Sequence, residues 1–307
     1  MINVAKKFFF YSIYNCYRFF VELPSVFFSK RNELISNGFC KFFSTDVEKL
    51  SNYLDQIIKN PNDAEKSTLG HFKIINKNDI GVKTLAIDPS SKFLHDYVFT
   101  DEIMSHIRKF FGKKFYLRNN PTIEYDYKGE KSNVQLFHVD GGLRQLSVMI
   151  NLTDLDDKKT HMEYLLKTNN QYFFYNAPNR FSEKEQNKIK KISIRSSVEK
   201  TTGKKGTVSI FNAGNGYHRQ IGLGNRTILH LNFVDNLLHT NWKKDWKPNV
   251  DKFPSEKSAY AYYFSWKDNK TYFKENNKVN SEIFSLVNRN LKNRLFSPNI
   301  YTNVKNY

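Results

Sequence analysis

The chain has 307 residues, and with 39% hydrophobic and 16% aromatic side chains it is long enough to bury one large core with appendages. Its two cysteines, Cys16 and Cys40, show no C-x-x-C spacing, which argues against a disulfide framework or a cysteine zinc site and makes a reducing, cytoplasmic compartment the default. The net charge of +18 is carried mostly by lysine, without an arginine-rich run or a nucleic-acid-binding module, so nucleic acid stays an unfavoured but open partner.

An aromatic and basic segment, residues 1–32, comes first in the chain and is predicted to be helical. Asn15, Arg18 and Glu22 interrupt its apolar stretch, which is too short to span a bilayer, and no small-residue cleavage site follows. Two interpretations stay open. The segment either packs as a helix on the core, or lies at a membrane surface, where basic side chains beside Phe and Tyr are favourable. The second interpretation would make the protein membrane-peripheral.

The main domain is expected over residues 33–240 and begins with a strand followed by a helix. The pattern N-G-F-C-K-F-F predicts the strand, and the helix starts at Thr45, because Thr45 and Glu48 have the spacing of a capping box. A second helix is predicted to start at Thr100 or Asp101 and to end at Gly112. Both have apolar residues at helical intervals and should cover the outside of a sheet.

From Lys114 onward the sequence changes to short runs of β-branched and aromatic residues. The runs are F-Y-L-R, T-I-E-Y-D-Y, N-V-Q-L-F-H-V, Q-L-S-V-M-I-N-L, H-M-E-Y-L-L-K, T-V-S-I-F and R-T-I-L-H-L-N-F-V. Because no long helix separates each pair, they predict an antiparallel sandwich or barrel, mainly β with flanking helices. In the fourth run apolar side chains alternate with Ser147, Met149 and Asn151, so one face should be buried while the other is free to line a pocket.

Two parts of the chain are expected to be additions to this barrel. Residues 169–197 form an insertion, with a highly charged helix from Ser182 to about Lys191 that has too few apolar residues for a core. Residues 241–307 form a C-terminal extension, which is predicted to be helical from Ser281 and to pack on the barrel. Both additions should border the mouth of the barrel, because their apolar residues are too sparse for a second core.

His138, Asp140 and His218 are the candidate catalytic and metal-binding residues. His138 and Asp140 are two apart in V-Q-L-F-H-V-D, which we interpret as a strand, so the imidazole and the carboxylate share one face. His218 follows the glycine-rich turn N-A-G-N-G-Y, and a second strand can bring it to that face. Two histidines and a carboxylate form the facial triad of non-haem Fe(II) oxygenases, which leaves positions open for oxygen and a cosubstrate. The triplet H-x-D alone also occurs by chance, as an ordinary polar pair at a strand end.

The order of the motifs carries more weight than any one of them. H-x-D-G is followed by L-S-V-M-I-N-L-T-D-L-D, then by G-T-V-S-I-F-N-A-G-N-G-Y-H-R, and then by N-R-T-I-L-H-L-N-F. With the opening L-I-S-N-G-F-C-K-F-F-S-T-D-V-E-K-L, the sequence from Glu33 to Asp235 resembles the phytanoyl-CoA dioxygenase-like family of Fe(II)/2-oxoglutarate-dependent oxygenases. The resemblance implies a double-stranded β-helix, a jelly-roll barrel, with His138, Asp140 and His218 as iron ligands. Family members that halogenate have a small residue in place of the carboxylate, so Asp140 favours hydroxylation.

Arg226 is our candidate for binding the far carboxylate of 2-oxoglutarate, since a guanidinium can donate two parallel charge-assisted hydrogen bonds. Its spacing from His218 is shorter than the family commonly shows, and a surface arginine after a Gly-Asn turn is the alternative. His230 lies on the same face of its strand and is a rival, whereas Arg219 should face away from the pocket. The resemblance adds three candidates for contact with the cosubstrate: Arg144, Thr122 and Tyr125.

The sequence therefore favours a hydroxylase that uses Fe(II), 2-oxoglutarate and O2 on a small lipid, acyl or sugar-type substrate. The first alternative is a nucleic-acid- or protein-modifying oxygenase, which the net charge of +18 supports and salt-sensitive binding of DNA or RNA would reveal. The second is a catalytically inactive jelly-roll binding module, which stoichiometric Fe(II) binding with 2-oxoglutarate turnover would exclude. The motifs do not name the substrate, because specificity in such barrels usually lies in loops and appendages.

Overall fold

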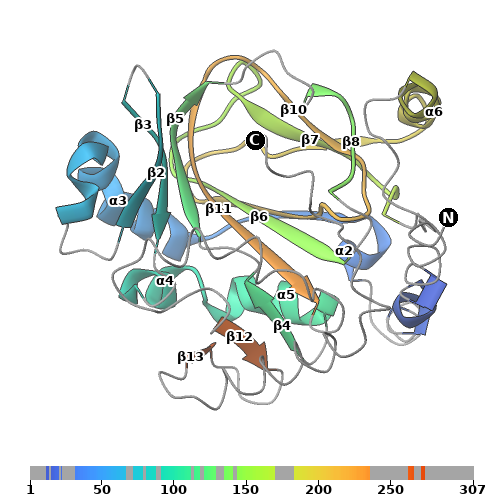
Figure 1. The fold of residues 1–307 in the computed structure, drawn as a ribbon, viewed down its shortest axis with the longest axis horizontal. Helices are drawn as coiled ribbons and strands as arrows, with labels where there is room; N and C mark the ends of the chain where they lie inside the picture. The colour runs from blue at the N-terminus through green and yellow to red at the C-terminus, as the bar shows by residue number, and fades with distance from the viewer. Residues whose placement is uncertain are drawn as a thin grey trace, which may run out of the picture.

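The computed structural model describes residues 12–13, 15–20, 22, 32–66, 72–78, 81–87, 91–111, 114–117, 121–128, 135–140, 144–169, 183–235, 262–265 and 271–273 (Figure 1). Its helices are α2 (Glu33–Ser36), α3 (Thr45–Lys59), the 3-10 helix η1 (Pro61–Lys66), α4 (Lys92–Tyr97), α5 (Asp101–Phe111) and α6 (Glu183–Ser193). Its strands are β1 (Phe39–Phe43), β2 (Phe72–Asn78), β3 (Gly81–Ile87), β4 (Lys114–Leu117), β5 (Thr122–Lys128), β6 (Gln145–Asn151), β7 (His161–Leu165), β8 (Val198–Lys200), β9 (Thr207–Asn212), β10 (His218–Ile221), β11 (Asn225–Asp235), β12 (Tyr262–Ser265) and β13 (Thr271–Phe273).

The larger of two antiparallel sheets is built around β11. It has the order β1-β9-β6-β11-β4-β12-β13, and β5 also pairs with β11 and carries the hairpin β2–β3. β11 pairs with β6 along one edge, and with β5 and then β4 along the other. The unit β5-β11-β6-β9 forms one layer of a barrel.

The second sheet forms the other layer. Its order is β10-β7-β8, and a bridge between His138 and His218 adds residues 135–140 at the β10 edge. Along the chain the segments alternate between layers: β5 lies in the first, 135–140 in the second, β6 in the first, β7 and β8 in the second, β9 in the first, β10 in the second and β11 in the first. Two interleaved antiparallel layers of this kind make a double-stranded β-helix, or jelly roll, which confirms the predicted fold.

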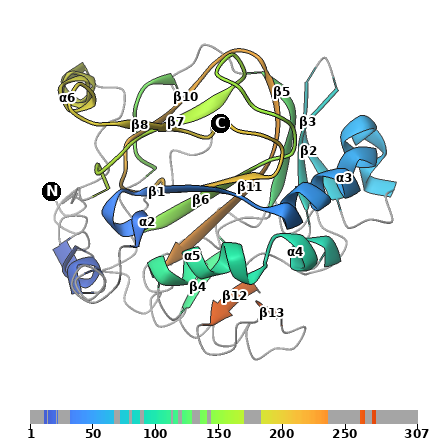
Figure 2. The ribbon, with the colours of Figure 1, turned by 180° about the vertical axis from the view of Figure 1, so that it is seen from behind.

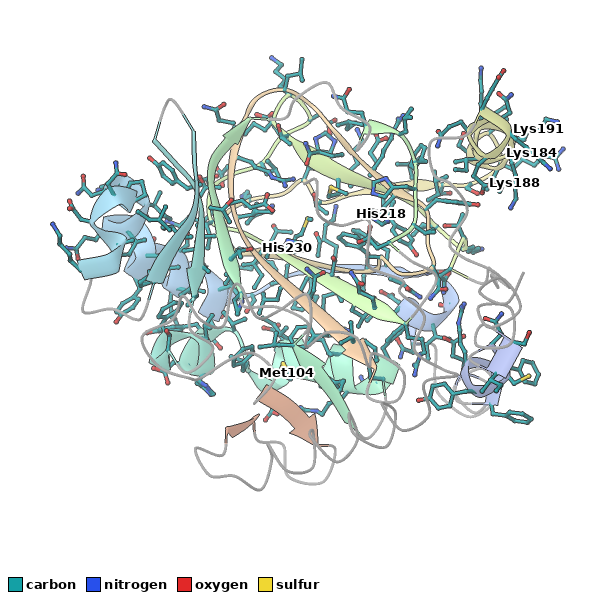
Figure 3. All side chains as sticks on the ribbon, in the orientation of Figure 1. Met104, Lys184, Lys188, Lys191, His218 and His230 are labelled. Atoms are coloured by element: carbon teal, nitrogen blue, oxygen red, sulfur yellow. The ribbon has the colours of Figure 1, made fainter. Side chains whose placement is uncertain are left out.

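Helices cover the outer face of the larger sheet, as Figures 1 and 2 show. The helices α3 and α5 bury apolar residues such as Leu54 and Met104, the latter labelled in Figure 3. They pack into one hydrophobic cluster with alternate residues of the strands, among them Leu146, Val148 and Ile150 of β6. The intervening residues of β6 turn the other way, and Met149 packs with Tyr164 of β7 between the sheets. The alternation seen in the sequence thus separates an apolar core from the lumen of the barrel.

Residues 135–140 do not form the regular strand that the sequence predicted. Within this segment only His138 makes a β-bridge, through reciprocal backbone hydrogen bonds of 2.9 Å with His218. The reason is that β10 begins at His218 and the chain turns through residues 213–216 just before it. The strand edge that faces residues 135–140 is therefore too short for a regular strand to pair with it. Asp140 is held separately by its backbone N–H, which donates to the carbonyl of Ala213 at 2.8 Å.

Two strand pairs lie where the sequence indicated none. The hairpin β2–β3 extends the sheet beyond β5, and β12 pairs with both β4 and β13. The described part of the C-terminal extension is therefore two strands rather than a helix, and the helix expected from Ser281 lies outside the described residues. Lys and Asn weaken the strand pattern of F-K-I-I-N-K-N, so pairing with neighbours decides its conformation.

The N-terminal segment is helical at residues 12–13, 15–20 and 22. Arg18 is 1% exposed, donates to the carbonyl of Asn169 and lies 3.0 Å from Glu22. This contact supports the interpretation of a helix packed on the core, while Phe19 and Phe20 stay 49% and 69% exposed. Contact of residues 1–32 with a membrane stays a prediction. In the described part of the chain, no helix combines the length and apolarity needed to cross a bilayer.

Candidate metal centre

His138 and His218 stand side by side across their backbone bridge. Because the two residues exchange both N–H···O bonds, their side chains emerge on one face. The ring centroids are 4.5 Å apart, and the ring planes are inclined by 52°. Both imidazoles are buried, at 6% and 3% exposure, whereas 29% of the Asp140 side chain is exposed. Solvent therefore reaches the cluster on the side of Asp140.

The donor atoms of these three residues converge. Nε2 of His138 lies 3.7 Å from Oδ1 of Asp140, and Nε2 of His218 lies 3.6 Å from the same oxygen. All three ligand atoms lie within 4.8 Å of one another. Metal–donor bonds of about 2.1 Å place neighbouring donors about 3 Å apart, so small side-chain rotations bring all three onto one ion. Two imidazole nitrogens and a carboxylate oxygen are suitable donors for Fe(II).

Backbone carbonyls orient both imidazoles. Nδ1 of His138 lies 2.8 Å from the carbonyl oxygen of Leu136, and Nδ1 of His218 lies 3.0 Å from that of Gly216. A carbonyl oxygen only accepts hydrogen bonds, so we assign the proton to Nδ1 in both rings and the lone pair to Nε2, the atom that faces Asp140. Gly216 cannot carry a side chain without displacement, because a Cβ there would lie 1.7 Å from the hydroxyl of Tyr164.

Polar side chains lead from Asp140 into the lumen. Nε2 of Gln145 lies 3.4 Å from Oδ2 of Asp140 and 3.4 Å from Oδ1 of Asn232. The hydroxyl of Ser147 donates to the same oxygen of Asn232 at 2.7 Å, and it lies 3.3 Å from Nε2 of His230. Neighbouring side chains of β6 and β11 thus connect the carboxylate of Asp140 to the imidazole of His230, farther along the barrel.

The series of contacts ends in a buried ion pair. Nδ1 of His230 lies 3.6 Å from one carboxylate oxygen of Glu124, and Arg226 pairs with the other. Burial opposes the ionisation of Glu124, but the charge of Arg226 and the hydrogen bond with His230 outweigh it and lower the pKa of Glu124 to about 2. Six side chains form what we call the lumenal polar row: Gln145, Asn232, Ser147, His230, Glu124 and Arg226.

The other predicted cosubstrate contacts fall on different sides of the sheet. Thr122 lies opposite His230 in the register of β5 and β11 and shares the lumenal face. Tyr125, three residues along the same strand, packs against the hydrophobic cluster that the helices cover. The structure therefore brings Thr122 to the polar row and holds Tyr125 away from it, because strand residues an odd number apart face opposite ways.

Arg144 lies outside the barrel lumen. It is completely buried, its guanidinium donates to the carbonyl of Phe110 and lies 3.4 Å from Glu22, and it stacks 4.7 Å above the Phe110 ring. These contacts join the residue before β6 to α5 and to the N-terminal helix. The charge of Arg144 is thus engaged by Glu22 and a helix carbonyl, and its contact with the cosubstrate stays a prediction that these contacts do not support.

Arg219 faces away from the metal candidates, as expected. It lies 2.7 Å from Glu163 of β7 and 4.3 Å above the ring of Phe137. Together with α6 these residues line a cavity of about 500 Å³ on the outer face of the second sheet.

The insertion helix α6 is bonded to both segments that carry the histidines. Gln186 donates to the carbonyl of Phe137 at 2.9 Å, and the hydroxyl of Tyr217 donates to Glu185 at 2.6 Å. Phe137 and Tyr217 immediately precede the two histidines of the cluster. On the opposite side, α6 projects three lysines outward in Figure 3: Lys184, Lys188 and Lys191.

Glu124 and Gln145 were not identified from the sequence, and α6 was predicted as a helix but without its contacts to the histidine segments. Glu124 had a usable signal, since it is two residues from Thr122 and must share its face. Gln145 begins the strand whose polar face was expected to line a pocket. The role of α6 depends on contacts distant in the sequence, and no local pattern indicates them.

A double-stranded β-helix with His-x-Asp and a more distant His on one face is the arrangement of non-haem Fe(II) oxygenases. Three protein donors on one face leave the other positions of an octahedral ion open. In this chain the three residues border a lumen that contains an arginine, an imidazole and a hydroxyl group.

No protein-family model and no curated protein matches this sequence. Among solved structures, EctD from S. alaskensis, described with 2-oxoglutarate and 5-hydroxyectoine, is 18% identical at a TM-score of 0.49, over 66% of this chain and 74% of that one. The non-haem alpha ketoglutarate dependent carbocyclase SnoK is 12% identical at 0.45, over 69% and 86%. The non-haem monooxygenase ThoJ is 11% identical at 0.45, over 86% and 97%. The strand order of this chain defines its fold, and the convergence of His138, Asp140 and His218 defines the candidate metal centre.

Proposed function

We propose that this chain is an Fe(II)- and 2-oxoglutarate-dependent dioxygenase that hydroxylates a small organic substrate. The observation that carries the proposal is the convergence of His138, Asp140 and His218, whose ligand atoms lie within 4.8 Å of one another. The orientation of both imidazoles by backbone carbonyls supports it, because the nitrogens that face the cluster are then free to bind a metal. Bound iron with 2-oxoglutarate and O2 would supply the oxidising chemistry, which belongs to the cofactor rather than to the protein.

The protein residues in this proposal bind and orient. His138, His218 and Asp140 would hold one face of the ion and leave room for the bidentate 2-oxo acid and for O2. Asp140 also keeps the third protein position occupied by a carboxylate, which favours hydroxylation over halogenation. The buried imidazoles exclude water from their side of the ion.

Arg226 and Thr122 are our proposed contacts for the far end of 2-oxoglutarate. Two observations support them: both lie on the lumenal face, and the polar row that ends at Arg226 begins at Asp140. A guanidinium can bind a carboxylate through two parallel hydrogen bonds. We leave Tyr125 and Arg144 out of the proposed site, since their contacts lie with the apolar core and with the N-terminal helix.

The proposed substrate class is a lipid, acyl or sugar-type metabolite. The protein should bind Fe(II) anaerobically in a one-to-one ratio and convert 2-oxoglutarate to succinate when a suitable substrate is present. A panel of lipids, acyl thioesters, nucleotide sugars and oligonucleotides tests the class, with mass spectrometry to detect one added oxygen atom in the product. Turnover on oligonucleotides alone would overturn the small-molecule proposal, and a protein that binds neither Fe(II) nor 2-oxoglutarate would end the oxygenase proposal itself.

A further inference from the structure

The guanidinium proposed to bind the cosubstrate already has an anionic partner. Arg226 and Glu124 are both largely buried, with 3% and 20% of their side chains exposed. At neutral pH Glu124 is a carboxylate, and so the pair has no net charge. A second carboxylate that arrives at Arg226 must share the guanidinium with Glu124, or displace it.

The charges do not balance when the site is filled. With His230 neutral, bound ferrous iron and Arg226 would bring three positive charges at the residues that the structure describes, whereas Asp140, Glu124 and the two carboxylates of 2-oxoglutarate would bring four negative ones. Leaving one negative charge uncompensated in a buried site is costly, and a nearby titratable group responds by changing its protonation.

His230 is the group placed to respond. Its Nδ1 lies 3.6 Å from Glu124, and Ser147 is at its Nε2. Thr122 of β5 and Met149 of β6 stand opposite it in the two registers, and neither titrates. Within the described part of the chain, the charged groups nearby are Glu124 and, on the same strand face, Arg226, which stays protonated. A neutral imidazole can accept a proton at a ring nitrogen, so His230 is placed to take one from solvent.

We propose that Arg226, Glu124 and His230 act as one carboxylate-binding unit, in which the binding of 2-oxoglutarate is coupled to the uptake of one proton by His230. Glu124 is a specificity-determining residue in this unit, because its charge opposes a dicarboxylate unless His230 is protonated. The inference rests on the proposed function, since it takes 2-oxoglutarate as the ligand. Its consequence is that cosubstrate affinity falls as pH rises through the neutral range.

Calorimetry of 2-oxoglutarate binding tests the coupling without turnover. The protein is loaded with Mn(II) in place of Fe(II) and titrated between pH 6 and 8, in buffers of different ionisation enthalpy, which reports the number of protons taken up. We expect close to one proton for the wild type, and an affinity that weakens by up to about tenfold per pH unit. Glu124→Gln removes one negative charge, so it should bind about tenfold more tightly at pH 8 with little proton uptake. His230→Gln should also take up almost no proton, but should bind more weakly than the wild type at pH 6.

Glu163→Gln is the matched control, because Glu163 forms an ion pair with Arg219 on the outer face of the barrel. It should keep the affinity and proton uptake of the wild type. Binding without proton uptake in the wild type, weaker binding by Glu124→Gln, or uptake that persists in His230→Gln would each overturn the inference and leave the proposed function standing. Failure of the Mn(II)-loaded wild type and of Glu124→Gln to bind 2-oxoglutarate at all would instead remove the proposed cosubstrate, and the inference with it.

Discussion

The hydroxyl of Tyr217 donates a hydrogen bond of 2.6 Å to Glu185, which joins the charged insertion to the residue before His218. The neighbouring Gln186 holds the carbonyl of Phe137, the residue before His138. One helix with a single buried apolar residue, Ile189, therefore braces both histidine segments. The insertion was expected to border the barrel mouth because its apolar residues are too sparse for a second core, and its contacts give it a part in positioning the metal candidates.

Replacing Glu185 and Gln186 by alanine should weaken metal binding without unfolding the barrel. Supporting residues around a metal ligand typically contribute about 10- to 100-fold in affinity, and here the loss should be near the lower value, because the backbone bridge remains. Competition with a metal chelator measures the change. Lys184→Ala and Lys191→Ala are matched controls on the outward face of α6 and should keep wild-type affinity. Equal affinity in the double variant and these controls would assign α6 no role at the centre.

His138→Ala and His218→Ala should each abolish stoichiometric binding of Fe(II). Each removes one of three ligands, so the loss should exceed the roughly 100-fold that a supporting residue contributes. Anaerobic Fe(II) binding measures the outcome, and circular dichroism checks that the fold is kept. His95→Ala on α4 is the control, since this half-buried histidine lies outside the cluster. Full Fe(II) binding by either triad variant would show that the metal binds elsewhere.

The local patterns predicted the barrel, His138 and Asp140 because these depend on short spacings, whereas His218 was selected by the glycine-rich turn before it and by the order of the motifs. Alternation in β6 separated the core from the lumen, and two residues of separation placed His138 beside Asp140. The same rule applies to β5: Tyr125 is three residues from Thr122 and faces the other way, while Glu124, two residues from Thr122, shares its face. Strand parity therefore favours Glu124 over Tyr125 as a lumenal side chain.

Other features depend on contacts that no local pattern contains. Arg144 is adjacent to a lumenal strand, but Glu22, from the other end of the sequence, lies 3.4 Å from its guanidinium. The hairpin β2–β3 has a weak strand pattern and gains its conformation from pairing with β5. The sequence indicates which charged residues lie near the site, but it does not show which partner neutralises each charge.

The two cysteines should differ in reactivity, because only one of them is accessible. Burial raises the pKa of Cys40 to about 12, the carboxylate of Glu33 adds to this effect, and a backbone hydrogen bond from Ile210 only partly offsets it. Its thiolate is therefore scarce at neutral pH, whereas Cys16 is exposed. A thiol reagent should modify one cysteine in the native protein and two in denaturant, and Cys16→Ser should abolish the native reaction. Native reactivity that persists in Cys16→Ser would show that β1 does not bury Cys40.

The ion pair of Glu124 and Arg226 should make stability depend on pH in acid. Because the folded pKa of Glu124 is lowered from 4.5 to about 2, its contribution is present above pH 4.5 and is lost as the pH falls toward 2. That shift corresponds to about 3 kcal/mol. Urea unfolding should show the wild type losing this advantage over Glu124→Gln across the same interval. A constant difference between the two proteins from pH 7 to pH 3 would contradict the lowered pKa.

Arg226→Ala alone is a poor probe of cosubstrate binding, because it leaves Glu124 as a buried charge without its guanidinium and should cost about 3–5 kcal/mol of stability. The effect on 2-oxoglutarate is better measured in the Glu124→Gln background, where no carboxylate is stranded. There Arg226→Ala should weaken binding by about 2–4 kcal/mol, or roughly 30- to 1,000-fold, while the affinity for Mn(II) stays nearly unchanged. Arg226→Lys should recover only part of the loss, since an ammonium is a point charge and cannot form the paired hydrogen bonds of a guanidinium.

Arg219→Ala in the Glu163→Gln background removes an equivalent pair from the outer face and is the control. If both double variants bind 2-oxoglutarate equally well, Arg226 does not hold the far carboxylate, and His230 becomes the next residue to test.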